Sequence, residues 1–433
     1  MSSLYRLDAL RAFFDGKHVL LAGYGREGQS THRLIQMLGW NTHVEVGHDD
    51  REIETLLAAS DFDWVVKSPG IPMSQILPLV NASRITSQCD LFLRLFADQT
   101  VGVTGTKGKS TTTTLIGHVL QHAGTASNVI LAGNMGIPFF DIVDRIEPQT
   151  IIVAELSCHQ LQGITRAPHL SVLLNLYQEH LDHYGSYEEY GMAKMQIFLR
   201  QQQGDTGFYC TDSPDLVAMV ETQRPSIASR LIPYGRDEVQ RAPVSQWTTH
   251  LLGLHNRSNI YVARQLTALL GVDDNQFRHA LATFQGLPHR LQFVGTFQGI
   301  TFYNDSISTI PEATVAALKA VPGVETVILG GFDRGVDYTP LTDFLPTCRS
   351  LRNIVFVGAA GRRMHVALFE KDRYNILLCD DYREIVAWCY SYTHSGHSCL
   401  LSPAAASYDA FKNFEQRGDT FCMWVNQLGT GTI

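Results

Sequence analysis

The sequence predicts an α/β fold in which parallel sheets are divided among several domains. Short β-branched runs lead repeatedly into glycine-rich turns and then into amphipathic stretches, which is the pattern of β-α units around a parallel sheet. With 433 residues, the chain is longer than one hydrophobic core usually serves, so two or three domains are expected. Its 45% hydrophobic and 18% charged residues are the balance of a globular protein and argue against disorder.

The first region, residues 1–96, opens with a β-α unit. We expect a strand at 19–22, a turn at 23–28 and a helix at 30–38. A second apolar run at 64–66 ends in a sharp turn that contains Ser, Pro and Gly. The turn at 23–28 has the spacing G-x-G-x-x-G of a dinucleotide-binding loop, which is a weak signal by itself.

A central region, residues 97–285, and a last region, residues 286–433, repeat the pattern. Buried strands are expected at 100–104, 151–154 and 170–174 in the central region, and at 327–329, 354–357 and 399–401 in the last. A helix is expected at 111–121, directly after a glycine-rich loop. The sequence therefore predicts three α/β domains.

The loop Gly105-Thr106-Lys107-Gly108-Lys109-Ser110-Thr111 predicts a nucleotide phosphate site. Backbone N–H groups and the helix dipole converge where a strand, a glycine-rich loop and a helix meet. Lys109 adds a charge for the outer phosphates, and Ser110 is a candidate magnesium ligand. Val103 stands where the strict G-x-x-x-x-G-K-[ST] pattern has its first Gly, so this is a shorter variant. The alternative is a glycine-rich turn with an exposed lysine.

Three further candidates follow in the central region. Glu155 ends an apolar strand, where ligands of open α/β sheets collect, although a lone acid there is more often solvated. The segment 175–184 concentrates His and acidic residues, His180 among them, and is either part of a metal and phosphate site or a polar surface loop. Lys194 lies on a helical pattern, and the pattern by itself favours a surface lysine.

Charge and cysteine usage exclude several classes of protein. The net charge of -8 argues against a nucleic-acid partner. The eight cysteines include no C-x-x-C pair, which favours reduced thiols and a cytoplasmic location. The first residues lack an apolar signal core, and no apolar run approaches the roughly 20 residues that span a membrane, so a soluble protein is expected.

Taken together, these motifs resemble the Mur ligases of peptidoglycan synthesis, and the resemblance covers nearly the whole chain. The matching segments are 105–111, 133–138, 155–157, 175–182, 193–194, 255–259, 289–290 and 304–306. Two runs, 401–407 and 411–418, are similar to the glutamate-adding branch of the family. The resemblance implies an N-terminal Rossmann-like domain that binds a UDP-linked substrate, a central P-loop ATPase-like domain and a C-terminal Rossmann-like domain that binds an amino acid.

The resemblance also implies an activity, cofactors and site residues. The activity is ATP-dependent joining of D-glutamate to UDP-N-acetylmuramoyl-L-alanine through an acyl phosphate, by a monomer that uses Mg²⁺. Lys109, His180 and Lys194 are the expected catalytic residues. The expected metal ligands are Ser110, Glu155, His180 and a carbamylated Lys194. The expected nucleotide contacts, besides residues 105–111, are Asn259, Arg290 and Asp305. The expected contacts to the other substrates are Arg26, Ser68, Asn134, Ser157, Gln160, Arg334, Ser407 and Phe414.

Two departures from the family pattern concern the incoming amino acid. Ile307 and Arg334 both stand where the glutamate-adding branch has Lys, and Ile cannot pair with a carboxylate. Ligation of L-glutamate therefore stays an alternative.

Three competing functions are open but less favoured. The interpretation as an NAD-dependent oxidoreductase is based on residues 23–28 alone. No acidic residue ends the next strand, about 20 residues further on, where a dinucleotide-binding fold has one. A folylpolyglutamate synthase is disfavoured by the run 411–418, and a regulatory protein without activity by the retained Lys109, Glu155, His180 and Lys194.

Overall fold

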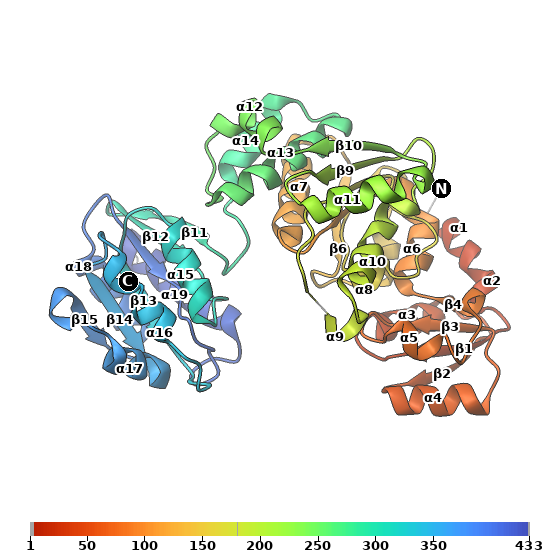
Figure 1. Cartoon of the computed structure of the whole chain (residues 1–433), viewed down its shortest axis with the longest axis horizontal. Coiled ribbons are helices and arrows are strands. Elements are labelled where there is room, and N and C mark those ends of the chain that lie inside the picture. The colour runs from red at the N-terminus through yellow and green to blue at the C-terminus, as the bar shows by residue number, and fades with distance from the viewer. Residues whose placement is uncertain (1–3, 180, 432–433) are drawn as a thin grey trace. The chain divides into compact units, whose positions relative to one another are not determined.

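A computed structural model describes residues 4–179 and 181–431 of the chain, and it confirms the predicted α/β fold class (Figure 1). Two compact units are formed: residues 1–247 with 255–281, and residues 248–254 with 282–433. The first unit holds two sheets of parallel strands, and the second holds a third, largely parallel sheet. The expected boundary between residues 96 and 97 falls inside the first unit, and the division into three domains stays a prediction.

The first sheet has the strand order β2-β1-β3-β4, with all pairs parallel. Its elements are α1 (Leu4–Leu7), α2 (Arg11–Phe14), β1 (His18–Ala22), α3 (Arg26–Leu38), β2 (His43–Gly47), α4 (Asp50–Ala59), β3 (Trp64–Lys67), α5 (Met73–Ile76), β4 (Ile85–Thr86) and α6 (Gln88–Phe96). Because β2 and β3 pair with opposite sides of β1, the loops after β1 and β3 diverge, and such a switch point is where α/β sheets bind ligands.

One predicted boundary in this sheet is wrong. The helix expected at 30–38 begins at Arg26, so the turn shrinks to residues 23–25. Gly28 permits this start, because a Cβ at that position would lie 2.3 Å from the carbonyl oxygen of Gly23. The first turn of α3 thus packs directly on the end of β1, where the sequence pattern suggested a longer glycine turn.

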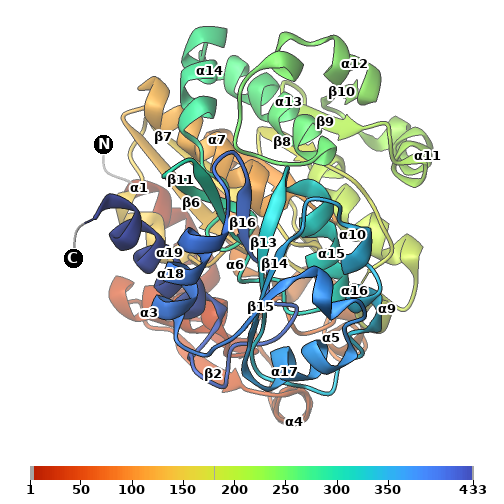
Figure 2. The same ribbon diagram turned by 90° about the vertical axis from the view of Figure 1, so that its left-hand side faces the viewer.

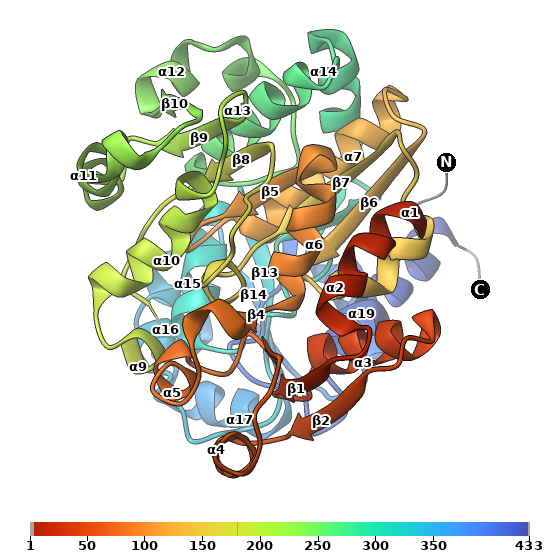
Figure 3. The ribbon, with the colours of Figure 1, turned by 90° about the vertical axis from the view of Figure 1, so that its right-hand side faces the viewer.

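The second sheet has the order β10-β9-β8-β5-β7-β6 and is parallel throughout. Its elements are β5 (Thr100–Thr104), α7 (Lys109–Ala123), β6 (Asn128–Gly133), β7 (Thr150–Glu155), α8 (Cys158–Leu161), β8 (Leu170–Leu173), α9 (Leu181–Tyr184), α10 (Tyr187–Leu199), β9 (Thr206–Cys210), α11 (Pro214–Gln223), β10 (Arg230–Tyr234), α12 (Arg236–Arg241), α13 (Leu254–Leu269) and α14 (Asp274–Thr283). The loops after β5, β7 and β8 lie at one edge because these three strands are neighbours (Figure 3).

The sheet of the second unit has the order β11-β12-β16-β13-β14-β15, in which only β11 is antiparallel to its neighbour (Figure 2). Its elements are β11 (Gln292–Phe297), β12 (Ile300–Asn304), α15 (Pro311–Ala320), β13 (Val324–Gly330), α16 (Thr339–Thr342), β14 (Asn353–Val357), α17 (Gly358–Ala367), β15 (Asn375–Leu378), α18 (Tyr382–Tyr392), β16 (Ser398–Leu401) and α19 (Phe414–Thr430). Successive residues of β13 and β14 enter different hydrophobic clusters, so both faces of this sheet are covered.

The two sheets of the first unit share one hydrophobic core. Val19 of β1, Phe92 of α6 and Ile152 of β7 belong to the same buried cluster. The rings of Phe92 and Phe139 stack with centroids 4.6 Å apart and link α6 to the segment after β6. This core fixes the first sheet against the second and so fixes the loops that line the space between them. Among the described helices, none is both long and apolar enough to cross a membrane.

Candidate active site

The glycine-rich loop joins β5 to α7, as predicted. Gly108 has φ 87° and caps the N-terminus of α7, which begins at Lys109, two residues earlier than expected. Gly105 has φ 149°, and a Cβ there would lie 3.0 Å from the Cβ of Leu174. Both glycines are therefore required by the backbone path. Since Gly108 has no side chain to cap the helix, the first N–H groups of α7 point to a site for an anion.

Asn175, at the end of the neighbouring strand β8, fastens this loop. Its Oδ1 accepts hydrogen bonds from the N–H groups of Thr106 (3.1 Å) and Lys107 (2.9 Å). The hydroxyl of Thr106 contacts the hydroxyl of Tyr190 at 2.9 Å, and the Lys107 ammonium pairs with Glu179. The side chains of Thr106 and Lys107 thus hold the loop to residues 175–190. A phosphate contact from either residue would therefore come from its backbone.

Two lysines converge on the carbonyl oxygen of Gly105. Lys109 Nζ donates to this oxygen and to that of Thr106, at 3.0 Å each. Lys194 Nζ, from α10, donates to the same oxygen of Gly105 at 3.0 Å. The alternative of an exposed lysine at 109 is wrong, because the side chain folds back over its own loop and is half-buried.

Lys194 is buried, with 1% of its surface exposed, so the surface position favoured by its helical pattern is wrong. Burial lowers the pKa of Lys194 to about 8, and the nearby ammonium of Lys109 acts in the same direction. Burial also lowers the pKa of Lys109, against the opposing effect of Glu155. The two lysines and the acid therefore share one electrostatic environment beside the loop.

Glu155 is the last residue of β7 and lies beside the end of β5, where Val103 is its partner in the strand register. It is only 2% exposed, so a solvated surface acid is excluded. Its Oε1 accepts a hydrogen bond from Asn134 Nδ2 at 2.6 Å, whereas its Oε2 is buried without a partner among the described residues. A carboxylate oxygen left this way suits a hard cation such as Mg²⁺. Ser110, in the first turn of α7, offers a hydroxyl oxygen from the neighbouring strand's loop.

Of the remaining predicted nucleotide residues, Asn259 is brought to the loop. It is buried on α13, and its Oδ1 lies 2.9 Å from the place that a Cβ on Gly108 would occupy. Its Nδ2 donates to Asn256 Oδ1 at 2.9 Å, which fixes the orientation of the amide. His180, the predicted base and metal ligand, lies outside the described residues.

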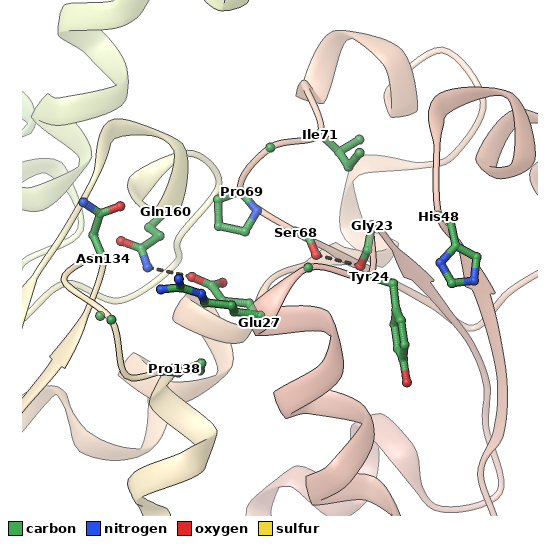
Figure 4. Close-up of a pocket in the computed structure, with 15 residues that line it drawn as sticks. Gly23, Tyr24, Glu27, His48, Ser68, Pro69, Ile71, Asn134, Pro138 and Gln160 are labelled. Carbon is green, nitrogen blue, oxygen red and sulfur yellow. Dashed lines mark hydrogen bonds between the residues drawn. The ribbon is translucent and has the colours of Figure 1, made fainter. Parts of the chain in front are cut away.

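A pocket of about 410 Å³ lies in the first unit, between loops of its two sheets (Figure 4). The lining residues come from the loops after β1, β2 and β3, from the end of β6 and the loop after it, and from helices α3 and α8: Gly23, Tyr24, Gly25, Arg26, Glu27, His48, Ser68, Pro69, Gly70, Ile71, Gly133, Asn134, Gly136, Pro138 and Gln160. Ser68 Oγ donates to the carbonyl oxygen of Gly23 at 2.7 Å, which ties the two loops of the switch point together. Four predicted substrate residues, Arg26, Ser68, Asn134 and Gln160, therefore line one pocket.

Ser157, another predicted substrate residue, caps a helix and is not among the residues that line the pocket. It caps α8 by accepting from the N–H of Gln160 at 3.2 Å, and the side chain of Gln160 accepts from the N–H of Ser157 at 3.0 Å. This reciprocal capping box fixes the side chain of Gln160 at the pocket wall.

In the second unit, Asp305 follows β12 and is almost fully buried. Its Oδ2 accepts hydrogen bonds from the hydroxyls of Ser308 (2.6 Å) and Ser402 (2.8 Å). Burial raises the pKa of Asp305 to about 6, and nearby Arg290 acts against the rise. Arg290 is exposed, so of these two predicted nucleotide residues Asp305 is fixed and Arg290 is accessible.

The predicted amino-acid residues of this unit surround a buried arginine for which the sequence patterns predicted no role. Arg417 of α19 donates to Ser306 Oγ (2.9 Å), to the carbonyl oxygens of Ser306 (2.8 Å) and Ala405 (3.0 Å), and to that of Ala406 (3.1 Å). It thereby ties the loop after β12, which contains Ile307, to the loop that contains Ser407. The signal for this role is a basic residue inside an otherwise helical run, which local pattern alone cannot distinguish from a surface arginine.

Arg334 and Phe414 also lie at these loops. Arg334 is exposed and donates to the carbonyl oxygen of Thr309 at 3.0 Å, two residues after Ile307. The carbonyl oxygen of Phe414 accepts from Ser306 Oγ at 2.8 Å, and Ser407 is 2% exposed. Arg334 and Phe414 therefore contact the segment 306–309. Ser407 lies in the loop that Arg417 joins to this segment.

Replacing Arg417 with methionine is expected to lower the free energy of unfolding of the second unit by about 3 kcal/mol or more, because three carbonyl oxygens and a hydroxyl lose their buried donor. Thermal unfolding measures the effect. Arg349→Met, at an exposed position, is the matched control. Equal unfolding temperatures for the two variants would contradict the role of Arg417.

Comparison with known proteins identifies the family of the chain. A family model described as the Mur ligase middle domain matches residues 103–267. The chain is 33% identical to the UDP-N-acetylmuramoylalanine–D-glutamate ligase of Geotalea uraniireducens (strain Rf4), over 96% of the chain and 98% of the relative. It is 34% identical to the ligase of the same name from Lacticaseibacillus paracasei, over 96% and 97%. The MurF ligase of Thermotoga maritima, solved in complex with ADP, has a similar fold, with a TM-score of 0.53, 18% identity and coverage of 96% and 95%. The chain therefore belongs to the Mur ligase family.

Proposed function

We propose that the chain joins D-glutamate to UDP-N-acetylmuramoyl-L-alanine with hydrolysis of ATP to ADP and phosphate, in peptidoglycan synthesis. One observation carries the proposal: Lys109, Lys194 and the free carboxylate oxygen of Glu155 gather at the phosphate loop. The relatives named D-glutamate ligases support it over nearly the whole chain. The cytoplasm is the proposed compartment, and a monomer is the proposed working form.

Each sheet is assigned one part of this reaction. Residues 1–96 form a Rossmann-like domain that binds the UDP-linked substrate, as the pocket at the switch point of the first sheet supports. Residues 97–285 form a P-loop ATPase-like domain that binds ATP. Residues 286–433 form a Rossmann-like domain that binds the amino acid, and Arg334, Ser407 and Phe414 are its proposed contacts. Asn259, Arg290 and Asp305 are proposed as nucleotide contacts.

The first chemical step is attack by the alanyl carboxylate on the γ-phosphorus of ATP. A new bond forms between the carboxylate oxygen and phosphorus, and the bond to the leaving ADP oxygen breaks, which gives an acyl phosphate. This transfer needs positioning and neutralisation of charge more than covalent help. The N–H groups of the first turn of α7 and the ammonium of Lys109 supply both at the phosphates.

The second step is attack by the amine of glutamate on the acyl carbon, after which phosphate leaves with its oxygen and the amine loses a proton. His180 is proposed as the group that receives this proton. Asn134, hydrogen-bonded to Glu155, is placed to orient the substrate carboxylate from the pocket toward the phosphate loop. Arg26, Ser68, Ser157 and Gln160 are proposed to bind the rest of that substrate.

Two Mg²⁺ sites are proposed at the loop, and the partnerless carboxylate oxygen of Glu155 supports the first of them. Ser110 and Glu155 would hold one ion, and His180 with a carbamylated Lys194 would hold or bridge to the other. Carbamylation needs a neutral amine, whose fraction the lowered pKa of Lys194 increases near neutral pH, and it replaces a cation by an anion. Bound there, Mg²⁺ would neutralise charge on the phosphate oxygens.

The test is an assay of purified protein with ATP, Mg²⁺ and UDP-N-acetylmuramoyl-L-alanine. Phosphate release and the mass of the product are compared for D-glutamate and L-glutamate, with a reaction that lacks the muramoyl substrate as the background. D-glutamate is expected to give product. Product with L-glutamate only would mean that the chain ligates that isomer. This is the alternative that Ile307 and Arg334 suggest. Absence of product with both would end the ligase proposal.

A further inference from the structure

The pocket contains a carboxylate that the proposed function does not yet use. Gln160 Oε1 accepts a hydrogen bond from the N–H of Ser157 at 3.0 Å, so its Nε2 must be the group facing Glu27. That Nε2 donates to Glu27 Oε1 at 2.6 Å (Figure 4). Glu27 Oε2 is buried and has no hydrogen-bond partner among the described residues. One oxygen of a pocket-lining carboxylate is therefore left without a hydrogen-bond partner among the described residues.

A buried lysine lies near this carboxylate. Lys67, at the end of β3, is 2% exposed, and its Nζ donates to the carbonyl oxygens of Ile71 (2.9 Å) and Ser68 (3.2 Å). Burial raises the pKa of Glu27, and Lys67 acts against this rise. Burial lowers the pKa of Lys67 to about 8, which leaves most of the ammonium charged at pH 7. The fixed positive charge favours the carboxylate form of Glu27, which accepts hydrogen bonds and donates none.

The position of Glu27 along the pocket indicates which part of a ligand it meets. Figure 4 shows His48 and Tyr24 at one end, the turn of Gly23 and Ser68 next to them, then Glu27 with Gln160, and Asn134 at the other end. The glycine turn at the N-terminus of α3 suits a diphosphate. Asn134 leads on to Glu155 and the phosphate loop. A ligand that extends from the diphosphate site to the reaction centre must pass Glu27.

We propose that Glu27 is a specificity-determining residue whose Oε2 accepts a hydrogen bond from an O–H or N–H group of the N-acetylmuramoyl part of the substrate. The inference rests on the proposed function, which supplies a ligand with a diphosphate at one end and a carboxylate at the other. Gln160 acts as a positioning residue, because its amide holds the carboxylate with Oε2 toward the ligand. Lys67 contributes a nearby positive charge that stabilises the carboxylate form of Glu27.

Glu27→Gln tests this assignment with almost no change in shape. Gln160 Nε2 requires an acceptor opposite it, so the new amide must place its oxygen at the former Oε1 and its NH₂ at the former Oε2. An acceptor is thereby exchanged for a donor. Calorimetric binding of UDP-N-acetylmuramoyl-L-alanine is expected to weaken about 10- to 100-fold, the range for loss of a hydrogen bond to a charged group. Binding of UDP alone is expected to be unchanged or tighter, since a negative charge is removed from beside the diphosphate site.

Glu54→Gln makes the same chemical change at an exposed position of α4 and is the matched control. It should bind both ligands as the unmodified protein does. Thermal unfolding of Glu27→Gln without ligand checks that the pocket is intact. Unchanged binding of the muramoyl ligand, or an equal loss for this ligand and UDP, would overturn the assignment to the sugar.

A failure of substrate binding and a failure of ligation are distinguishable in these experiments. If the unmodified protein binds UDP-N-acetylmuramoyl-L-alanine but forms no amide, the proposed function falls, and the contrast between the two ligands still decides the role of Glu27. If the unmodified protein does not bind this ligand at all, the inference on Glu27 is overturned as well.

Discussion

Lys109→Met is expected to lower kcat by at least about 100-fold, because removal of one preorganised donor from a site of developing negative charge typically has this effect. The ammonium of Lys109, at the start of α7, donates hydrogen bonds to the carbonyl oxygens of Gly105 and Thr106. Methionine keeps an unbranched side chain, one atom shorter than lysine, and removes its charge. Steady-state release of phosphate at saturating ATP measures the loss.

A matched control separates chemistry from folding in this experiment. Lys319→Met removes an exposed lysine from α15 and should retain the activity of the unmodified protein. Circular dichroism and thermal unfolding should be alike for both variants, because Gly105 keeps Lys194 as a donor to its carbonyl oxygen. Full activity of Lys109→Met would show that the loop does not bind the reacting phosphates.

Lys194→Ala is the second change with a large expected effect. Loss of activity is expected because the proposed metal site would lose its carbamate oxygens, and a small carboxylate such as acetate should restore part of the rate. The side chain is buried beside the phosphate loop, so a cavity remains for the added ion. Ligation rates with and without acetate measure the rescue, and chloride at equal ionic strength is the control. A fully active Lys194→Ala would remove the carbamate proposal.

The lowered pKa of Lys194 gives this proposal a pH dependence with a definite sign. The folded pKa of about 8 lies below the ordinary value of 10.5, so the neutral amine grows as pH rises toward and through about 8. Only the neutral amine forms a carbamate, and activity should therefore rise between pH 6 and 8. Lys194→Ala rescued with acetate lacks this amine and should lack the corresponding step. The same pH profile for both proteins would assign the titration to another group, such as the amine of glutamate.

The strands that the sequence predicted share one property, which is that they lie inside their sheets. Each of the predicted strands, from β1 to β16, has neighbours on both sides, and most of them are largely apolar runs. Every edge strand of the three sheets was missed: β2, β4, β6, β10, β11 and β15. Edge strands are half-exposed, as the residues of β10 and β15 show, so they lack the run that marks a buried parallel strand. The interior strands β9 and β12 were missed too: polar residues and Gly interrupt them as they interrupt β5, but no glycine-rich loop follows them.

The candidate site divides along similar lines. Residues 105–111 could be located because a phosphate loop is a local structure, built from a strand end, two glycines and a helix start. Glu155 could be placed at a strand end, but its burial and its bond to Asn134 depend on the adjacent β6 and on the packing of the second sheet. No role could be predicted from the sequence for Glu27, Lys67 and Arg417, because the surroundings that give each its role come from distant parts of the chain.

The sequence by itself determined the fold class, most of the interior strands and the phosphate loop, since these depend on hydrophobic periodicity and on glycines at fixed local spacing. Only the tertiary structure decided that Lys194 is a buried amine at the loop and that Glu27, which lines the pocket, has a buried carboxylate oxygen without a partner among the described residues. A helical lysine has the same local pattern whether its face meets water or a second sheet. Burial, and with it the shift of a pKa, is fixed by contacts between residues distant in the sequence, which no local pattern contains.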